Sequence, residues 1–176
     1  MKKGFSWMAA SVALLARGCT SGKSTENIPA VTPFSVERYM GTWYEIARLP
    51  HWFESGLDNV SVTYTLREDG RIAVLNRGFN QGNACDTRGV GRLQGCPDIG
   101  EFEVSFFRPF YGAYRVIALA DDYSSAIVTG STSDYLWILA RTPQLSEEVL
   151  GRYVDKIRQW GYEIKALEFP PQTRTR

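Results

Sequence analysis

The stretch that decides the fold is Tyr39-Met40-Gly41-Thr42-Trp43-Tyr44-Glu45-Ile46-Ala47-Arg48. It places a glycine two residues before a tryptophan, directly after a short helical turn that Ser35 is suited to cap. Gly41 allows a tight backbone turn, and the large ring of Trp43 can then swing inward and fill one end of a closed sheet. We therefore predict that Gly41 and Trp43 form the closed base of a β-barrel.

The composition suits one globular domain with no unusual charge. The chain has 176 residues, of which 44% are hydrophobic and 22% are charged, so it can bury a single core. Its formal net charge is +1, with acids and bases interspersed, which gives no reason to expect nucleic acid as a partner. Aromatic residues make up 13% of the chain, and this fits either a concave apolar pocket or an ordinary core.

Alternating apolar and polar residues predict a meander of antiparallel strands. In the clearest run, apolar side chains from Val60 to Leu66 alternate with hydroxyl residues, so one face is buried and the other is wet. Asp69-Gly70 then predicts a hairpin turn. The predicted strands are the segment through Trp43 and residues 60–66, 71–79, 86–93, 102–107, 113–120, 125–130 and 135–141. Eight such strands can close into a barrel with room for one small ligand.

One helix and a short extra strand are predicted after the barrel. Ser146 is a typical N-cap, and apolar residues recur at spacings of three and four as far as Trp160. Gly161 ends this helix, and residues 162–169 form a predicted ninth strand. Residues 170–176 begin with two prolines and make up a C-terminal tail.

This order of elements resembles the lipocalin family, in particular its bacterial outer-membrane and apolipoprotein D-like branch. The resemblance covers residues 34–169 and includes two motifs besides Gly41 and Trp43. Ser133-Asp134-Tyr135 is similar to the family's turn before the last barrel strand, and Arg141 stands where the family has an arginine. The resemblance implies an all-β fold: an eight-stranded antiparallel up-and-down barrel with a C-terminal helix and a short ninth strand. We expect Arg141 to stack on Trp43 at the base.

Strand alternation predicts which residues line the inside of this barrel. If Trp43 points inward, parity places Leu139 and Trp137 on the same face of the last strand, and positions matching Tyr64 and Trp137 line the pocket in the apolipoprotein D-like branch. The predicted ligand-binding residues are Val62, Tyr64, Phe106, Tyr114, Val116, Trp137 and Leu139. A filled core with no cavity is the alternative, but inward-facing tyrosine hydroxyls favour a pocket because a buried phenol needs a polar partner.

The resemblance implies noncovalent binding, storage or transport of fatty acids or lysophospholipids in the bacterial cell envelope. We expect a monomer or weak homodimer without a cofactor. An enzyme acting on lipid would need a nucleophile beside a base, yet the only histidine is His51, in a predicted loop, and no Gly-x-Ser-x-Gly motif occurs. No His and Cys spacing predicts a metal site. An envelope interaction module with a packed barrel is a third class that stays open.

Two further features leave alternatives open. His51-Trp52-Phe53-Glu54 lies in the first long loop, and its rings either touch lipid or fold back over the barrel mouth. Cys85 and Cys96 are candidate disulfide partners in an oxidising periplasm. The strand predicted between them would separate its ends by about 36 Å, far beyond disulfide reach of about 7 Å. A bulge at residues 89–91 would allow the pairing.

Residues 1–19 predict an export signal that ends at an acylated cysteine. Lysines precede an apolar run from Phe5 to Ala16, which is shorter than the helix of about 20 residues that spans a bilayer. Gly18-Cys19 resembles a bacterial lipoprotein processing site, although Arg17 departs from the usual pattern. We expect a lipid on Cys19 to anchor the protein on the periplasmic face of the outer membrane, with export without a lipid as the alternative.

The residues after Cys19 predict a tether. Residues 20–33 are rich in Ser, Thr and Pro, and we expect them to be a flexible coil that joins the anchor to the domain at residues 34–169. A coil of this length would reach roughly 20 Å, so the domain would stay near the membrane surface.

Overall fold

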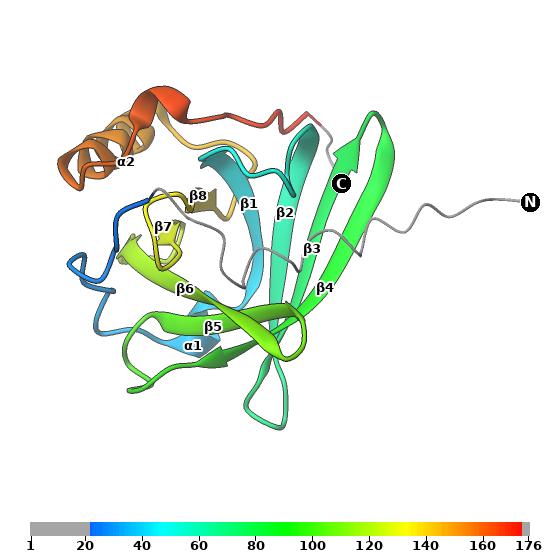
Figure 1. Ribbon diagram of the computed structural model, residues 1–176, viewed down its shortest axis with the longest axis vertical. Helices are drawn as coiled ribbons and strands as arrows, with labels where there is room; N and C mark the ends of the chain where they lie inside the picture. Colours follow the sequence, from blue (N-terminus) through cyan, green and yellow to red (C-terminus); the bar gives the residue numbers. More distant parts are fainter. Residues whose placement is uncertain (1–21, 174–176) are drawn as a thin grey trace, which may run out of the picture.

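Eight antiparallel strands pair with their neighbours in chain order, and the first also pairs with the last, so the sheet closes into a barrel (Figure 1). This computed structural model describes residues 22–173. Its elements are α1 (Val36–Tyr39), β1 (Gly41–Arg48), β2 (Leu57–Leu66), β3 (Ile72–Asn80), β4 (Asn83–Leu93), β5 (Glu101–Phe107), β6 (Phe110–Leu119), β7 (Ser125–Thr129), β8 (Leu136–Ala140), α2 (Glu147–Gln159) and the 3₁₀ helix η2 (Ile164–Ala166). The predicted eight-stranded barrel with one C-terminal helix is confirmed.

The base of the barrel is closed by Trp43, which is fully buried. Its indole N–H donates to the carbonyl of Tyr39 in α1 at 2.8 Å, and the Arg141 guanidinium lies 3.9 Å from its ring centroid. Gly41 has a φ of +96°, and an added Cβ would lie only 3.1 Å from Arg141, so this position requires glycine. The Arg141 guanidinium also donates to the carbonyls of Thr42, Arg38 and Tyr123. These hydrogen bonds connect three separate segments of the chain at the base.

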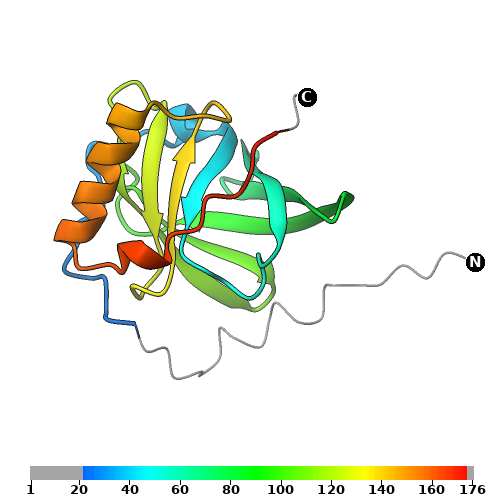
Figure 2. The same cartoon turned by 90° about the horizontal axis from the view of Figure 1, so that it is seen from above.

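The barrel wall separates two hydrophobic cores. One fills the lower interior around Trp43, and the other lies outside, between α2 and strands β1, β6, β7 and β8. Tyr153 and Ile157 of α2 are buried in the outer core, and the Tyr153 hydroxyl is hydrogen-bonded to Ser125 of β7 at 2.9 Å. Figure 2 shows α2 lying along the outside of the barrel. No helix among residues 22–173 is long and apolar enough to cross a bilayer.

The predicted ninth strand is reduced to one pairing residue. Glu168 exchanges two backbone hydrogen bonds with Arg48 of β1, whereas Ile164–Ala166 form the 3₁₀ turn η2. The Glu163 side chain accepts from the backbone N–H of Lys165 and starts this turn. The two prolines after Phe169 lack N–H donors, so the pairing with β1 cannot continue.

The prediction of a flexible tether is wrong for residues 22–33. Thr25 and Ile28 are buried, and the Arg115 guanidinium of β6 donates to both of their carbonyls at 2.7 Å. The polar composition of this segment led to the wrong prediction, because the segment is held largely by hydrogen bonds to its backbone. Such bonds can be made by any residue type, so the sequence does not reveal them. The segment packed on the barrel therefore includes residues 22–33, while residues 1–21, including Cys19, lie outside the described part.

Candidate functional site

The barrel has a closed end and an open end. Because β1 starts at the base and successive strands alternate in direction, the loops joining β1–β2, β3–β4, β5–β6 and β7–β8 all lie at the open end. Figure 2 shows α1 on the opposite side of the barrel from the β1–β2, β5–β6 and β7–β8 loops. A ligand that enters the interior from the mouth must pass between them.

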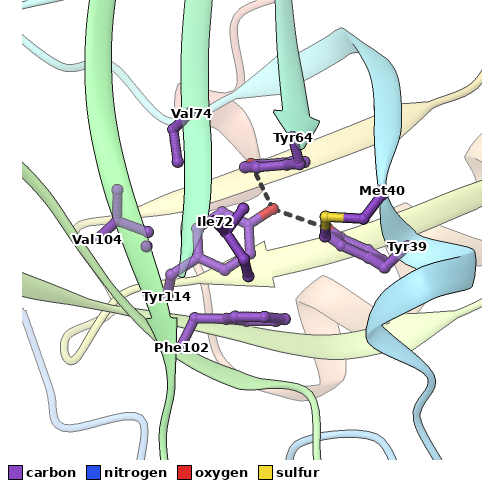
Figure 3. Close-up of a pocket in the computed structure, with 9 residues that line it drawn as sticks. Tyr39, Met40, Tyr64, Ile72, Val74, Phe102, Val104 and Tyr114 are labelled. Carbon is purple, nitrogen blue, oxygen red and sulfur yellow. Dashed lines mark hydrogen bonds between the residues drawn. The ribbon is translucent and has the colours of Figure 1, made fainter. Parts of the chain in front are cut away.

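The barrel interior contains a cavity of about 10 Å³, which is room for about one water molecule. It lies above the base and has an apolar and aromatic lining. The lining residues are Tyr39, Met40, Tyr64, Ile72, Val74, Gly91, Phe102, Val104 and Tyr114 (Figure 3). This cavity by itself is far too small to hold an acyl chain.

Three tyrosine hydroxyls meet at this cavity. Tyr64 donates to the Tyr114 oxygen at 2.8 Å, and the Tyr39 and Tyr114 oxygens lie 2.7 Å apart (Figure 3). Burial raises the pKa of all three phenols, so they stay protonated at neutral pH. Two hydrogen bonds use two of the three hydroxyl protons, and the third remains available to an acceptor on a ligand or to a water molecule.

The predicted ligand-binding residues do not share one site. Tyr64 and Tyr114 line the cavity. Val116 and Leu139 are buried in the interior core, and Val62 packs against that core without lining the cavity. Strand parity identified inward-facing residues but could not show which of them lie beside empty space.

The other two predicted residues lie toward the open end. Trp137 is half-buried, and its indole N–H donates to the Glu54 carboxylate at 3.1 Å. Phe106 is 37% exposed, and its ring lies over Gly89, where an added Cβ would be 2.8 Å from the ring. Phe106 does not line the small cavity, but the regular pairing of β5 with β4 keeps its ring on the inward face of the wall, closer to the mouth.

Sequence reasoning missed Tyr39 and Met40 because they precede the first strand, where alternation does not apply. Tyr39 lies in α1 and Met40 is its C-cap residue, and both reach the cavity from the base. Their position directly before Gly41 was the available signal, since a residue that immediately precedes the base turn can lie beneath the interior.

A buried cluster of charges lies toward the open end and was also missed. The Arg48 guanidinium contacts the Glu45 carboxylate at 2.7 Å and the Glu168 carboxylate at 3.2 Å, and it donates to the Glu54 carbonyl at 2.9 Å. Burial raises the pKa of Glu45 and of Glu54, and Arg48 only partly opposes this in both. A bulge between Glu45 and Ala47 changes the parity of β1 and makes this cluster unpredictable from alternation.

The β1–β2 loop folds partly over the mouth. The His51 ring is buried, stacks on Phe53 and Tyr135 and lies tilted against Trp137, with centroids 4.9 to 5.1 Å apart. Trp52 points away and is 42% exposed. The loop therefore places the His51 ring over the mouth, whereas Trp52 faces solvent.

His51 should make the folded protein sensitive to acid. Burial, reinforced by the Arg48 charge, lowers the pKa of His51 from 6.5 to about 4. Neutral His51 thus contributes stability above pH 6.5 that is lost as the pH falls toward 4, because the unfolded chain takes up the proton first. In His51→Gln we expect the decrease in unfolding free energy between pH 6.5 and pH 4 to be smaller than in the wild type by roughly 1 to 3 kcal/mol. Urea denaturation across this pH range measures it, and parallel pH profiles for variant and wild type would contradict it.

Cys85 and Cys96 are free thiols. Cys85 lies near the start of β4, whereas Cys96 follows its end. The pairing of β4 with β3 runs from Ile72 to Asn80 without a register shift, so no bulge shortens the distance between the cysteines. The suggested disulfide is therefore absent. Among residues 22–173, no group of His, Cys, Asp and Glu side chains could hold a metal ion.

Comparisons with known proteins agree with this architecture. A family model described as a lipocalin-like domain matches residues 34–172. The chain is 44% identical to the outer membrane lipoprotein Blc of Citrobacter freundii, over 90% of this chain and 91% of that protein. It is 37% identical to Blc of Vibrio cholerae, over 90% of this chain and 94% of that protein. Mouse apolipoprotein D is 31% identical, over 79% and 77% of the two chains.

Solved structures show the same fold at lower identity. Insecticyanin from the tobacco hornworm superposes with a TM-score of 0.68 at 19% identity, covering 85% of this chain and 86% of that chain. Lobster apocrustacyanin A1 superposes with a TM-score of 0.65 at 13% identity, covering 84% and 91%.

Proposed function

Because the chain belongs to the lipocalin family, we propose that its barrel binds fatty acids or lysophospholipids noncovalently and stores or carries them in the bacterial cell envelope. A Blc-like lipocalin is a binding protein for hydrophobic ligands and not an enzyme. The finer choice of ligand is supported by one observation: an apolar, aromatic cavity with a spare tyrosine O–H donor. An acyl chain matches the lining, and a carbonyl or phosphate oxygen matches the donor.

The small cavity sets a condition on this function. An acyl chain needs far more than 10 Å³, so it would have to extend from this cavity toward the mouth, past the half-buried Trp137, and move side chains where it does not fit. Each buried methylene contributes about 0.8 kcal/mol, so ten contribute roughly 8 kcal/mol, which corresponds to about micromolar binding before the cost of the rearrangement is subtracted. The same small volume favours a second candidate, a packed barrel that binds another envelope protein through exposed rings.

Trp137→Ala should weaken ligand binding about tenfold or more, because the indole stands between the cavity and the mouth and would contact a bound acyl chain. Displacement of a fluorescent fatty acid by unlabelled fatty acid and by lysophospholipid measures the effect. Trp160→Ala is the matched control, since Trp160 packs in the outer core. Unchanged affinity in Trp137→Ala would show that Trp137 does not contact the ligand. If unlabelled lipid displaces no fluorescent fatty acid from the wild type, the packed interaction module is favoured instead.

The protein is located at the outer membrane, as its Blc relatives are, and we propose that a lipid on Cys19 holds it there. Cells given labelled palmitate should incorporate it into the wild type but not into Cys19→Ser, and the variant should be recovered as soluble periplasmic protein. If neither protein takes up label, Arg17 has blocked processing and Cys19 is not the anchor.

A further inference from the structure

Exposed aromatic rings gather at the open end of the barrel. Trp52 lies in the β1–β2 loop, and Phe106, Phe107 and Phe110 flank the tip of the β5–β6 hairpin. We call these four residues the rim. They are four of the six large apolar side chains that are exposed among residues 22–173. The Phe107 and Phe110 rings stack with centroids 6.5 Å apart, so the hairpin presents an apolar tip.

The first described residues are fixed to the same end of the barrel. The Gly22 backbone N–H donates to the Asp134 carboxylate at 3.0 Å, and the Lys23 N–H donates to the Ser133 hydroxyl at 3.0 Å. Both acceptors belong to the β7–β8 loop. In Figure 2 this loop lies on the same side of the barrel as the β5–β6 hairpin and the β1–β2 loop.

The length of chain before this contact is short. Cys19 stands three residues before Gly22, and consecutive Cα atoms are about 3.8 Å apart, so their Cα atoms are separated by at most about 11 Å. A membrane anchor at Cys19 would therefore hold the open end, and not the closed base, close to the bilayer. The packing of residues 22–33 on the barrel removes the slack that a coil would have given.

We propose that the rim docks on the lipid surface of the outer membrane, with the barrel mouth opening toward the bilayer. This inference rests on the proposed anchor but not on the identity of the ligand. Aromatic rings settle at the level of the lipid headgroups, and exposed Arg108 and Lys23 at this end match the anionic phosphates. The four rings and the two cations thus fit one occupant, a phospholipid surface.

The first test uses Trp52 as the reporter. Full-length protein purified from expressing cells is added to vesicles of phosphatidylethanolamine and phosphatidylglycerol with brominated acyl chains, which quench indole fluorescence on contact. We expect Trp52→Phe to lose most of the vesicle-dependent quenching seen in the wild type. Equal quenching in the two proteins would overturn the proposal, because the exposed rim indole would then not reach the lipid.

A matched pair of variants tests the rim itself. Phe107→Ser removes an exposed ring at the open end, whereas Leu66→Ser removes an exposed apolar side chain at the closed end. We expect Phe107→Ser to lower the equilibrium constant for docking of the rim on lipid about tenfold, which reduces the quenching of tryptophan fluorescence. Leu66→Ser should leave this quenching unchanged. Equal effects would overturn the proposal. Fatty-acid displacement on the same samples separates ligand binding from membrane docking. If the wild type shows displacement but no quenching, docking is refuted. If it shows quenching but no displacement, docking is supported and the proposed ligand is refuted.

Discussion

Trp43→Ala should lower the free energy of unfolding by about 3 to 5 kcal/mol. The ring is fully buried, lies 4.8 Å from the Tyr39 ring between centroids, and has the Arg141 guanidinium over its face. Truncation leaves a void at the base that neighbours cannot easily fill, because Arg141 is tied to the carbonyls of Arg38 and Thr42. The barrel would then lose the residue that closes its lower end.

Urea denaturation and the melting temperature measure this loss. Trp160→Ala is the control, because Trp160 is only partly buried on the outside of the barrel, and we expect less than half the effect. Arg141→Ala should also destabilise the protein, and neither base variant should change which ligands are preferred. Equal melting temperatures for Trp43→Ala and the wild type would refute the role of Trp43 in closing the base.

Arg48→Leu should destabilise the folded protein at neutral pH by about 3 to 5 kcal/mol, which is the usual cost of breaking a buried ion pair from one side. The substitution leaves the Glu45 and Glu54 carboxylates buried without their cation, and it also removes the contact with Glu168. The leucine keeps much of the apolar volume of the arginine stem, so the loss reports mainly on charge.

The pH dependence of this loss identifies its cause. The pKa values of Glu45 and Glu54 are raised by burial above the usual 4.5, and removing Arg48 should raise them further. Carboxyls with raised pKa values favour the folded state in acid, and that stability is lost as the pH rises above 4.5. The deficit of Arg48→Leu should therefore shrink on acidification, and Glu45→Gln should rescue part of it at neutral pH. A deficit that does not change with pH would point to lost packing instead.

The fold could be predicted from the sequence because its determinants are local. Alternation within each strand, the Asp69-Gly70 turn and the Ser146 cap depend on residues near one another in the chain. The Gly41 and Trp43 spacing located the first strand, and the matching Arg141 located the last. Together these features predicted the strand count and the helix, whereas the resemblance to the lipocalins implied the strand order of the barrel.

The site was only partly predictable, because it depends on irregularities that the sequence pattern does not mark. A bulge in β1 changed which face Arg48 occupies. The volume of the cavity depends on how side chains from several strands interlock, and this cannot be derived from parity. The N-terminal segment was misjudged because its partner, Arg115, lies about 90 residues away in the chain.

The two cores give the barrel one stiff side and one compliant side. Among residues 22–173, the outer core under α2 draws on β1, β6, β7 and β8 and on no residue of β2 to β5. Backbone amides on the doubly covered side should exchange with solvent slowly, while β3 and β4 should open at a lower free energy. If the barrel enlarges when it binds a ligand, we expect strands β2 to β5 to move outward. The side covered by α2 would then keep its position.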